Sequence, residues 1–156
     1  MDIDIIIPIY NAFDFVKKCI ETVIEHTDLT QHTLLLVNDK STDERILPLL
    51  NSFIKENQSL NIILIDNKDN QGFVRTVNIG MQYSHHDVVL LNSDTEVTRN
   101  WLSKIQNCAY SKPAVATVTP LSNNATLASV PVFLAENTIP PGLSVEEYAD
   151  IVEKCS

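Results

Sequence analysis

The sequence contains few of the residues that build the common nucleotide-binding loops. Its 156 residues include three glycines, Gly72, Gly80 and Gly142. The dinucleotide fingerprint G-x-G-x-x-G and the phosphate loop G-x-x-x-x-G-K-[ST] need closely spaced glycines, because backbone N–H groups must approach phosphate oxygens. These glycines lie too far apart for either spacing, so both motifs are excluded in their usual form.

Cysteine is also scarce. Cys19, Cys108 and Cys155 are widely separated and form no C-x-x-C pair, which suits neither a disulfide framework nor a zinc knuckle. The N-terminus is acidic and its apolar run stops at Pro8, whereas a secretory signal has a basic start and a long apolar stretch. No run approaches the roughly 20 apolar residues of a membrane span. We therefore expect a protein of the reducing cytoplasm.

Basic residues are in the minority. The chain has 11 Lys and Arg against 20 Asp and Glu, which gives a net charge of −9. A broad basic surface for a phosphate backbone is not expected from this balance, so nucleic acid is excluded as a partner. The length is that of one domain, and the 44% of hydrophobic residues is enough to bury a core.

Short apolar runs alternate along the chain with segments of helical periodicity. The predicted strands, rich in Val, Ile and Leu as strands covered on both faces are, are Ile3–Ile9, Thr33–Asn38, Ile62–Asp66, Asp87–Asn92 and Ala114–Thr119. Apolar residues at helical spacing predict helices at about 15–24, 46–54, 73–83, 99–109 and 144–155. Such alternation is typical of βαβ units. We predict an α/β, Rossmann-like fold with a mostly parallel sheet and helices on both faces.

Two segments carry the S/T-x-x-E pattern of a capping box, in which Ser and Glu side chains satisfy free N–H groups of the first helical turn. They are Ser41–Glu44 before the second predicted helix and Ser144–Glu147 before the last. Between Pro120 and Gly142, prolines interrupt the pattern over a length that is unusual for a connection in a compact domain. This stretch is interpreted either as a lid or binding loop or as a surface wrap.

Polar side chains follow four consecutive predicted strands. The strand ends read Pro8-Ile9-Tyr10-Asn11, Val37-Asn38-Asp39-Lys40-Ser41-Thr42-Asp43, Asp66-Asn67-Lys68-Asp69-Asn70 and Leu91-Asn92-Ser93-Asp94-Thr95-Glu96. Asn, Asp, Ser and Thr are common in turns and caps, but in a doubly wound sheet ligands bind outside the carboxyl ends of the strands. Recurrence at four strand ends therefore predicts a binding rim.

Two of these side chains, Asp39 and Asp94, directly follow apolar strands. Carboxylates that face one pocket repel each other unless a cation or hydrogen-bond donors compensate. Oxygen ligands suit Mg²⁺ or Mn²⁺, and such ions commonly bridge protein carboxylates to substrate phosphates. The sequence therefore predicts a divalent ion at the rim.

The order of these motifs resembles the nucleotide-sugar-binding half of family 2 glycosyltransferases with the GT-A fold. The motifs are P-I-Y-N at 8–11, V-N-D-K-S-T-D at 37–43, N-Q-G-F-V-R-T-V-N-I-G at 70–80 and L-L-N-S-D-T-E-V at 90–97. The resemblance extends from about residue 3 to 130. It implies an inverting enzyme that transfers a sugar from a nucleotide diphosphate sugar to a glycan or lipid-linked acceptor.

The resemblance places the nucleotide base near the first two strand ends. Tyr10 and the backbone near Pro8, with Asn11 beside them, match the wall for the base, where an aromatic ring packs on the base face. Asp39 matches the carboxylate that accepts a hydrogen bond from the ring N–H of a uracil-like base. UDP- or dTDP-linked donors are therefore expected before GDP-linked ones. Asn38, which precedes Asp39, occupies a position where many members of the family carry a second Asp.

The other two motifs match the phosphate end of the donor site. Asn70, Gly72 and Arg75 match the segment beside the base and phosphates, where Arg75 either faces a phosphate or is simply solvated. Asn92-Ser93-Asp94 matches the D-x-D signature with Asn in place of the first Asp, so Asp94 is the expected ligand of Mn²⁺ or Mg²⁺ and Asn92 a neutral group near the ribose. Similar N-x-D forms occur in rhamnosyltransferase-like members, which indicates a deoxyhexose donor.

The catalytic base is not assigned. In the family it comes from the second half of the domain, often as a Glu-Asp pair, and that dipeptide does not occur in this sequence. We therefore expect a single donor-binding domain over residues 1–156, truncated before the acceptor-binding half. Many relatives build surface polysaccharides at the cytoplasmic face of a membrane, which leaves peripheral association with the inner face as a further expectation.

Three alternative interpretations compete with this one. A non-catalytic module that binds nucleotide sugars or a partner chain is compatible with Asn38, Asn92 and the missing base. A receiver domain of a response regulator needs an acidic pair after the first strand, where this chain has Tyr10 and Asn11. A nucleotidyltransferase would normally show a basic, glycine-rich loop at the same place, which is also lacking.

Overall fold

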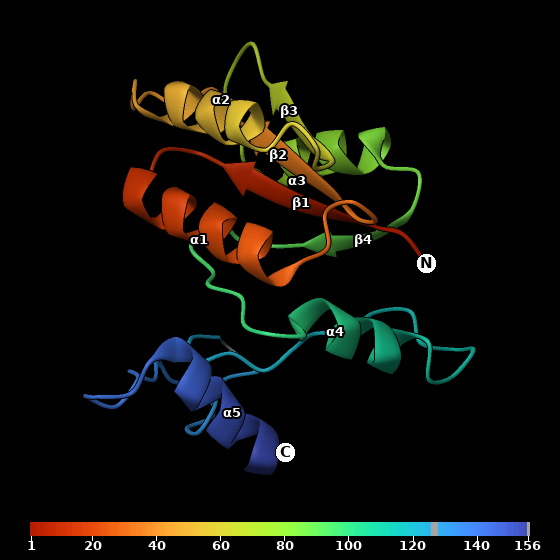
Figure 1. Cartoon of the computed structure of the whole chain (residues 1–156), viewed down its shortest axis with the longest axis vertical. Helices are drawn as coiled ribbons and strands as arrows, with labels where there is room; N and C mark the ends of the chain where they lie inside the picture. Colours follow the sequence, from red (N-terminus) through yellow and green to blue (C-terminus); the bar gives the residue numbers. More distant parts are fainter. Residues whose placement is uncertain (126–127, 156) are drawn as a thin grey trace. The chain divides into compact units, whose positions relative to one another are not determined.

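The computed structural model of the chain describes residues 1–125 and 128–155 (Figure 1). These residues form two compact units, one from Met1 to Val97 and one from Thr98 onward. The first unit contains β1 (Ile3–Ile9), α1 (Phe13–His26), β2 (Thr33–Asn38), α2 (Ile46–Glu56), β3 (Ile62–Asp66), α3 (Phe73–Tyr83) and β4 (Asp87–Leu90). The second contains α4 (Trp101–Ala109) and α5 (Val145–Cys155).

A parallel sheet organises the first unit. Its strand order is β3-β2-β1-β4, with Ile9 of β1 paired to Asn38 of β2 and Asn38 paired to Asp66 of β3. The chain moves outward from β1 to β3 and then crosses back to β4. Because crossover connections are right-handed, α1 and α2 cover one face and α3 the other, as Figure 1 shows. The predicted α/β fold with helices on both faces is confirmed.

The core lies on both sides of the two central strands. The side chains Ile5, Ile6, Ile7 and Ile9 of β1 and Leu34, Leu36 and Val37 of β2 are fully buried. On one face α1 contributes Val16, Cys19, Ile20 and Val23. On the other, Gly80 lets α3 approach closely, because a Cβ at this position would lie 2.7 Å from Cγ2 of Ile6 and 3.3 Å from Cγ2 of Val37.

Three details of the sequence prediction are wrong. The segment Ala114–Thr119 is not a strand, because it is irregular and mostly exposed. Its β-branched residues favour a strand only where a neighbouring strand pairs with it, and none does within the described residues. Strand β4 ends at Leu90, two residues earlier than predicted. Finally, Ser41–Glu44 is not a capping box, because α2 begins at Ile46 and the Ser41 hydroxyl instead accepts a hydrogen bond from the Asn11 backbone N–H, 2.9 Å away.

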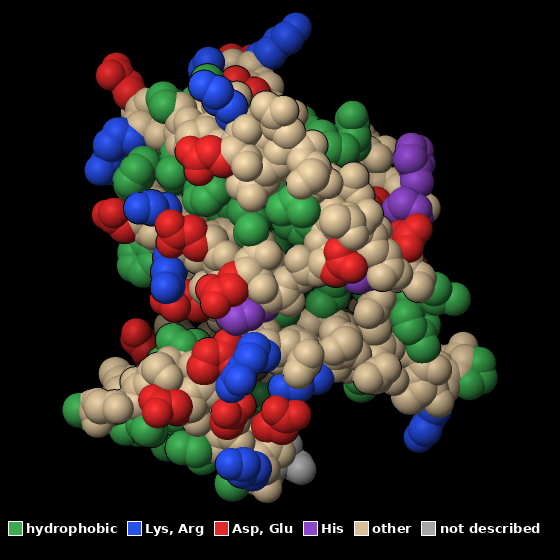
Figure 2. All heavy atoms as spheres, in the orientation of Figure 1, with side chains coloured by type: hydrophobic (Ala, Val, Ile, Leu, Met, Phe, Trp, Pro, Cys, Tyr) green, Lys and Arg blue, Asp and Glu red, His purple; other side chains and the backbone are tan. Residues whose placement is uncertain are grey.

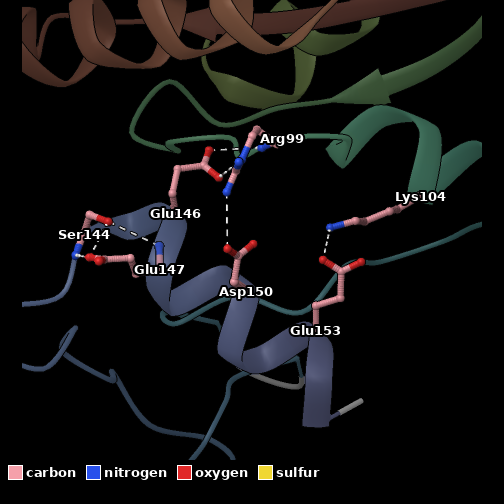
Figure 3. Close-up of polar contacts among 7 residues, drawn as sticks. All are labelled: Arg99, Lys104, Ser144, Glu146, Glu147, Asp150 and Glu153. Atoms are coloured by element: carbon pink, nitrogen blue, oxygen red, sulfur yellow. Dashed lines mark hydrogen bonds and ion pairs between the residues drawn. The ribbon is translucent and has the colours of Figure 1, made fainter.

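The second capping box is confirmed. The Ser144 hydroxyl accepts a hydrogen bond from the Glu147 N–H at 3.2 Å, and the Glu147 carboxylate accepts one from the Ser144 N–H at 2.8 Å (Figure 3). The hydrogen bonds that the Ser144 backbone N–H and hydroxyl donate to the Glu147 carboxylate hold the pKa of Glu147 below its usual range. Figure 3 also shows Arg99 bridging Glu146 and Asp150, and Lys104 bonded to Glu153. All of these ion pairs are solvent-exposed, so each contributes little stability.

In the described part of the stretch between Pro120 and Gly142, the side chain of Asn137 connects several segments of the loop. The buried Asn137 amide donates to the Ser129 hydroxyl at 2.8 Å and to the Val132 carbonyl at 3.0 Å, while its oxygen accepts from the Val132 N–H. Val132, Phe133 and Leu134 are nevertheless 57–59% exposed. A lid or binding role for this loop stays a prediction.

The described surface carries mixed charge. On the face shown in Figure 2, acidic side chains are scattered among basic ones, and no broad basic area is visible. Among the described helices, none is both long enough and apolar enough to span a bilayer. All three cysteines are free thiols, as the sequence predicts.

Candidate functional site

The four strand ends predicted to form a rim lie along one edge of the sheet. Because β1, β2, β3 and β4 are mutually parallel, their carboxyl ends point the same way. In the order β3-β2-β1-β4, the segment after β1 lies between the segments after β2 and β4. The sheet therefore brings the polar segments 10–11, 38–43, 66–70 and 91–96 to one rim, as the sequence predicts.

Asn11 joins the exits of β1 and β2. Asn11 and Ala12 are both in the left-handed region, each with φ 58°, and Asn tolerates this conformation better than most residues. The Asn11 side-chain oxygen accepts hydrogen bonds from the N–H groups of Thr42 and Asp43 at 2.8 and 2.9 Å. The side-chain oxygen of Asn11 is therefore occupied by hydrogen bonds from its own chain. The neighbouring Tyr10 is 49% exposed and Pro8 half-buried, so the Tyr10 ring is free to contact a ligand.

Asp39 is the most constrained polar residue of the rim. It is 3% exposed. Its Oδ1 accepts hydrogen bonds from the Gln71 N–H at 2.7 Å and from the Asn67 side-chain amide at 2.9 Å, and its Oδ2 accepts one from the Gly72 N–H at 2.8 Å. Asn70 adds a bond from its side-chain amide to the Asp39 carbonyl at 3.2 Å. One carboxylate therefore holds the whole turn between β3 and α3.

The charge of Asp39 is stabilised by these donors. Burial by itself raises the pKa of the carboxyl group, but hydrogen bonds from Gln71, Asn67, Thr76 and Gly72 outweigh burial and hold the pKa below its usual range. Gly72 is also the residue that precedes α3, and a negative charge is favourable at the N-terminus of a helix. Asp39 therefore places a negative charge beside the N-terminus of α3.

Gly72 has a conformation that only glycine adopts readily. Its φ of 76° and ψ of 163° fall in a region essentially closed to residues with a Cβ. This geometry turns both the Gln71 and the Gly72 N–H toward Asp39. Arg75 follows in the first turn of α3 and is exposed. Gly72 therefore has a structural role in the turn that leads into α3, while nucleotide contacts of Asn70, Gly72 and Arg75 stay predictions.

Two amide–carboxylate pairs cross from β2 to β3 in opposite directions. The Asn38 amide donates to Oδ1 of Asp66 at 2.7 Å, and one residue further the Asn67 amide donates to Oδ1 of Asp39. Each carboxylate thus faces an amide rather than a second carboxylate. The sequence analysis did not identify Asn67 or Thr76 as site residues. A signal was present, since N-D ends β2 and D-N ends β3 in paired register.

The pairing of Asn38 with Asp66 predicts the effect of placing a second carboxylate at position 38. Asn38→Asp places a carboxylate at hydrogen-bond distance from Asp66, so we expect about 1–2 kcal/mol of destabilisation at pH 7. The loss should shrink at acidic pH, because two carboxylates in contact retain one proton. Urea denaturation tests this. The double variant Asn38→Asp/Asp66→Asn restores one amide and one carboxylate and should recover most of the loss, and failure to do so contradicts the pairing.

The segment after β4 is a loop with buried ends and an exposed tip. Leu91 and Val97 are 7% and 6% exposed, whereas Asn92 and Asp94 are exposed. Two residues of α1 anchor this loop: the Cys19 thiol lies 3.5 Å from the Asn92 carbonyl, and the Thr22 hydroxyl accepts a hydrogen bond from the Val97 N–H at 3.2 Å.

The carboxylates at this tip affect the thiol beneath them. Burial raises the pKa of Cys19 to about 12, and the negative charges of Asp94 and Glu96 add to the shift. Both carboxylates belong to the same short loop, whose Asn92 carbonyl lies 3.5 Å from the thiol. At such a pKa the thiol is protonated at neutral pH, so Cys19 acts as a packing residue rather than a nucleophile.

Asp39 and Asp94 have different surroundings. Their strands are separated by β1, and with a strand spacing of about 4.8 Å the two strand ends are roughly 10 Å apart. Asp39 is buried and already accepts three hydrogen bonds from its own chain, whereas Asp94 is exposed, so Asp94 is the better candidate for a metal ligand. No group of three His, Cys, Asp or Glu side chains placed to hold a metal is found among the described residues.

The family model for glycosyl transferase family 2 matches residues 4–134. Polypeptide N-acetylgalactosaminyltransferase 11 of Xenopus tropicalis is 31% identical over 104 residues, which are 65% of this chain and 17% of that protein. Among solved structures, the Pyrobaculum calidifontis mannosyltransferase PcManGT in complex with GDP-Man and Mn²⁺ aligns with a TM-score of 0.66 at 17% identity, over 71% of this chain and 32% of that one. Residues 1–349 of TarS from S. aureus, in complex with UDP-GlcNAc, align with a TM-score of 0.57 at 18% identity, over 68% and 30% of the two chains.

These comparisons establish what the chain is. It spans less than a third of the length of each of these three proteins, and the two structural alignments, at 17% and 18% identity, bear on the fold. They confirm the predicted GT-A fold. Because the family model covers most of the sequence, the chain belongs to glycosyl transferase family 2.

Proposed function

We propose that this chain binds a nucleotide diphosphate sugar as the donor part of a metal-dependent, inverting glycosyltransferase. The observation that carries the proposal is the division of the rim between two carboxylates. Asp39 is buried and fixed at the end of β2, and Asp94 is exposed at the tip of an anchored loop after β4. The ends of β2 and β4, which these carboxylates follow, are roughly 10 Å apart along the sheet edge, which suits a ligand with a base at one end and a diphosphate at the other.

The base end is proposed to select a pyrimidine. Oδ1 of Asp39 accepts two hydrogen bonds and Oδ2 one, so Oδ2 retains an acceptor position for the ring N–H of uracil or thymine. The Tyr10 side chain is available to pack on the face of the base, beside Pro8 and Asn11. This assignment favours UDP- or dTDP-linked donors over GDP-linked ones.

The phosphate end is proposed to use Asp94 and a divalent ion. Asn92 and Asp94 lie two residues apart on the exposed tip of the loop, with Asp94 as the metal ligand and Asn92 as a neutral partner near the ribose. Arg75, with Asn70 and Gly72, would contribute from the start of α3. Bound Mn²⁺ or Mg²⁺ supplies neutralisation of the negative charge that grows on the diphosphate as the sugar leaves.

Donor sugar, acceptor and location are further parts of the proposal. The N-x-D form of the metal motif supports a rhamnosyltransferase-like enzyme with a deoxyhexose donor. The acceptor is a glycan or a lipid-linked saccharide, as in the assembly of surface polysaccharides. The three free thiols support a cytoplasmic location, with peripheral association at the inner face of the membrane as the arrangement that would bring the donor site to a lipid-linked acceptor. No described residue is assigned as the catalytic base.

Calorimetric titration tests the proposal. UDP, dTDP, GDP and CMP are titrated into the protein, each with Mn²⁺ and with EDTA. We expect pyrimidine diphosphates to bind, and to bind at least about tenfold more tightly with Mn²⁺, equivalent to about 1.4 kcal/mol. Absence of binding by every nucleotide would contradict the donor site and favour the non-catalytic module. Equal affinity for GDP and UDP would contradict the role of Asp39 in base selection.

A further inference from the structure

We propose that Asn67 is a positioning residue of the donor site, which orients the Asp39 carboxylate so that Oδ2 is the oxygen left for the nucleotide base. The inference rests on the proposed function and adds a residue that none of the rim motifs contains. It begins from the contacts of Asn67, which lies directly after β3 and is 8% exposed.

Asn67 is held on three sides. Its backbone N–H donates to the Asn38 carbonyl at 2.9 Å and so extends the pairing of β2 with β3 by one residue. Its side-chain nitrogen lies 2.9 Å from Oδ1 of Asp39 and 3.4 Å from the Thr76 hydroxyl of α3. One buried amide therefore connects the exits of β2 and β3 with the first turns of α3.

This geometry determines which carboxylate oxygen is available. Oδ1 of Asp39 already accepts the Gln71 N–H, and the Asn67 amide provides its second hydrogen bond. A carboxylate oxygen accepts about two such bonds, so Oδ1 is saturated. Oδ2 accepts one backbone hydrogen bond, from the Gly72 N–H, and the Thr76 hydroxyl also interacts with this carboxylate. Without the amide of Asn67, rotation of the carboxylate would no longer be restrained from the side of β3.

Asn67→Asp tests the inference with little change of shape. The new carboxylate would face Asp39, and two carboxylates in contact share one proton at low pH and repel when both are ionised. With the shared proton, the introduced carboxyl group can donate to Asp39 as the amide does. The charged residues within two positions of Asp39 or of position 67 in the sequence are Lys40, Asp66, Lys68 and Asp69, and they are the same in both proteins.

The readout is nucleotide affinity as a function of pH. UDP and ADP are titrated into the wild type and Asn67→Asp with Mn²⁺ at pH 5.5 and at pH 8. We expect the variant to lose at least about tenfold in UDP affinity between these pH values, with a smaller change for ADP, because the effect passes through Asp39 and the pyrimidine ring. The wild type should change no more than about twofold.

A matched control is available at the other end of the same strand. Asn61 immediately precedes β3, is exposed, and donates its amide to the Thr30 carbonyl at 3.1 Å. Asn61→Asp makes the same chemical change at the opposite edge of the sheet and should follow the wild type at both pH values. A variant Asn67→Asp that binds UDP as the wild type does at pH 8 overturns the inference.

A second measurement keeps folding and function apart. Hydrogen exchange of the Gln71 and Gly72 amides, both bonded to Asp39, should be at least about tenfold faster in Asn67→Asp than in Asn61→Asp at pH 8. Asn67→Ser removes the amide without adding a charge and serves if Asn67→Asp unfolds; we expect it to weaken UDP binding several-fold more than ADP binding, and equal losses would overturn the inference. Failure of the wild type to bind any nucleotide would instead contradict the proposed function.

Discussion

Asp39→Asn is expected to remove pyrimidine-nucleotide binding and to lower the free energy of unfolding by about 2–4 kcal/mol at neutral pH. The wild-type carboxylate accepts hydrogen bonds from the Gln71 and Gly72 N–H groups and from the Asn67 amide. An amide has one acceptor oxygen and two N–H donors, so at least one of these buried donors would face another donor. The charge at the start of α3 would also be lost.

The difference in the free energy of unfolding between the wild type and Asp39→Asn should increase with pH. The pKa of Asp39 lies below its usual range in the folded protein, so the folded state binds fewer protons than the unfolded state and stability rises with pH across this interval. The contribution of the carboxylate is complete above about pH 4, the usual pKa of Asp. It is lost as the pH falls through the lower pKa of the folded protein.

The measurement is urea denaturation of the wild type and Asp39→Asn at pH 7 and at pH 3, together with titration of UDP at pH 7. Asp69→Asn is the matched control, because Asp69 is an exposed carboxylate in the same turn and its change should be within about 0.5 kcal/mol. The difference in the free energy of unfolding between wild type and Asp39→Asn should be smaller at pH 3 than at pH 7. An Asp39→Asn protein as stable as the control at pH 7 would show that the three donors are satisfied without the charge.

The sheet was predictable because its central strands are covered on both faces. β1, β2 and β3 begin and end where the sequence predicts, since a strand between two layers of helices has to be apolar along its whole length. The segment 114–119 has a similar composition but lies in the second unit, where no described strand provides a paired neighbour. Apolar composition indicates a strand only if an edge is available for pairing.

The location of the rim was predictable from the sequence, but only some of its hydrogen bonds were. Parallel topology places strand ends together, so the Asn and Asp residues that follow the strands had to meet at one edge. Two partners of Asp39 had no comparable signal, because they are backbone N–H groups whose direction depends on the conformation of Gly72. Backbone donors have no sequence identity, and a loop has no periodicity from which to locate them.

The capping box that failed has the same explanation. Ser41 and Glu44 carry the right residue types at the right spacing, but Asn11 from the exit of β1 binds the Ser41 hydroxyl and the N–H groups that follow it. A contact across 30 residues replaced a local one. Local patterns of Ser, Asp and Asn are thus least reliable at the rim, where polar side chains from several strands compete for the same backbone groups.

Asp94→Ala is expected to remove the effect of Mn²⁺ on nucleotide affinity and to leave the fold intact. Asp94 is exposed, and the loop that carries it is fixed by contacts of Cys19 and Thr22 with backbone atoms rather than by the Asp94 side chain. The free energy of unfolding should therefore change by less than about 0.5 kcal/mol. UDP affinity in Mn²⁺ should fall by at least about tenfold, or about 1.4 kcal/mol, and in EDTA the variant and the wild type should bind equally.

Glu96→Ala provides the matched control for this experiment. Glu96 is also exposed, lies two residues from Asp94, and acts on the same Cys19 thiol, so its removal deletes an equal charge from the same loop. If the tip of the loop attracts Mn²⁺ through net charge alone, both variants should lose affinity equally, and the assignment of Asp94 would be wrong. If Asp94 binds the ion directly, Glu96→Ala should keep most of the response to Mn²⁺, because a direct ligand bond depends on the position of one carboxylate whereas a charge effect depends on their number.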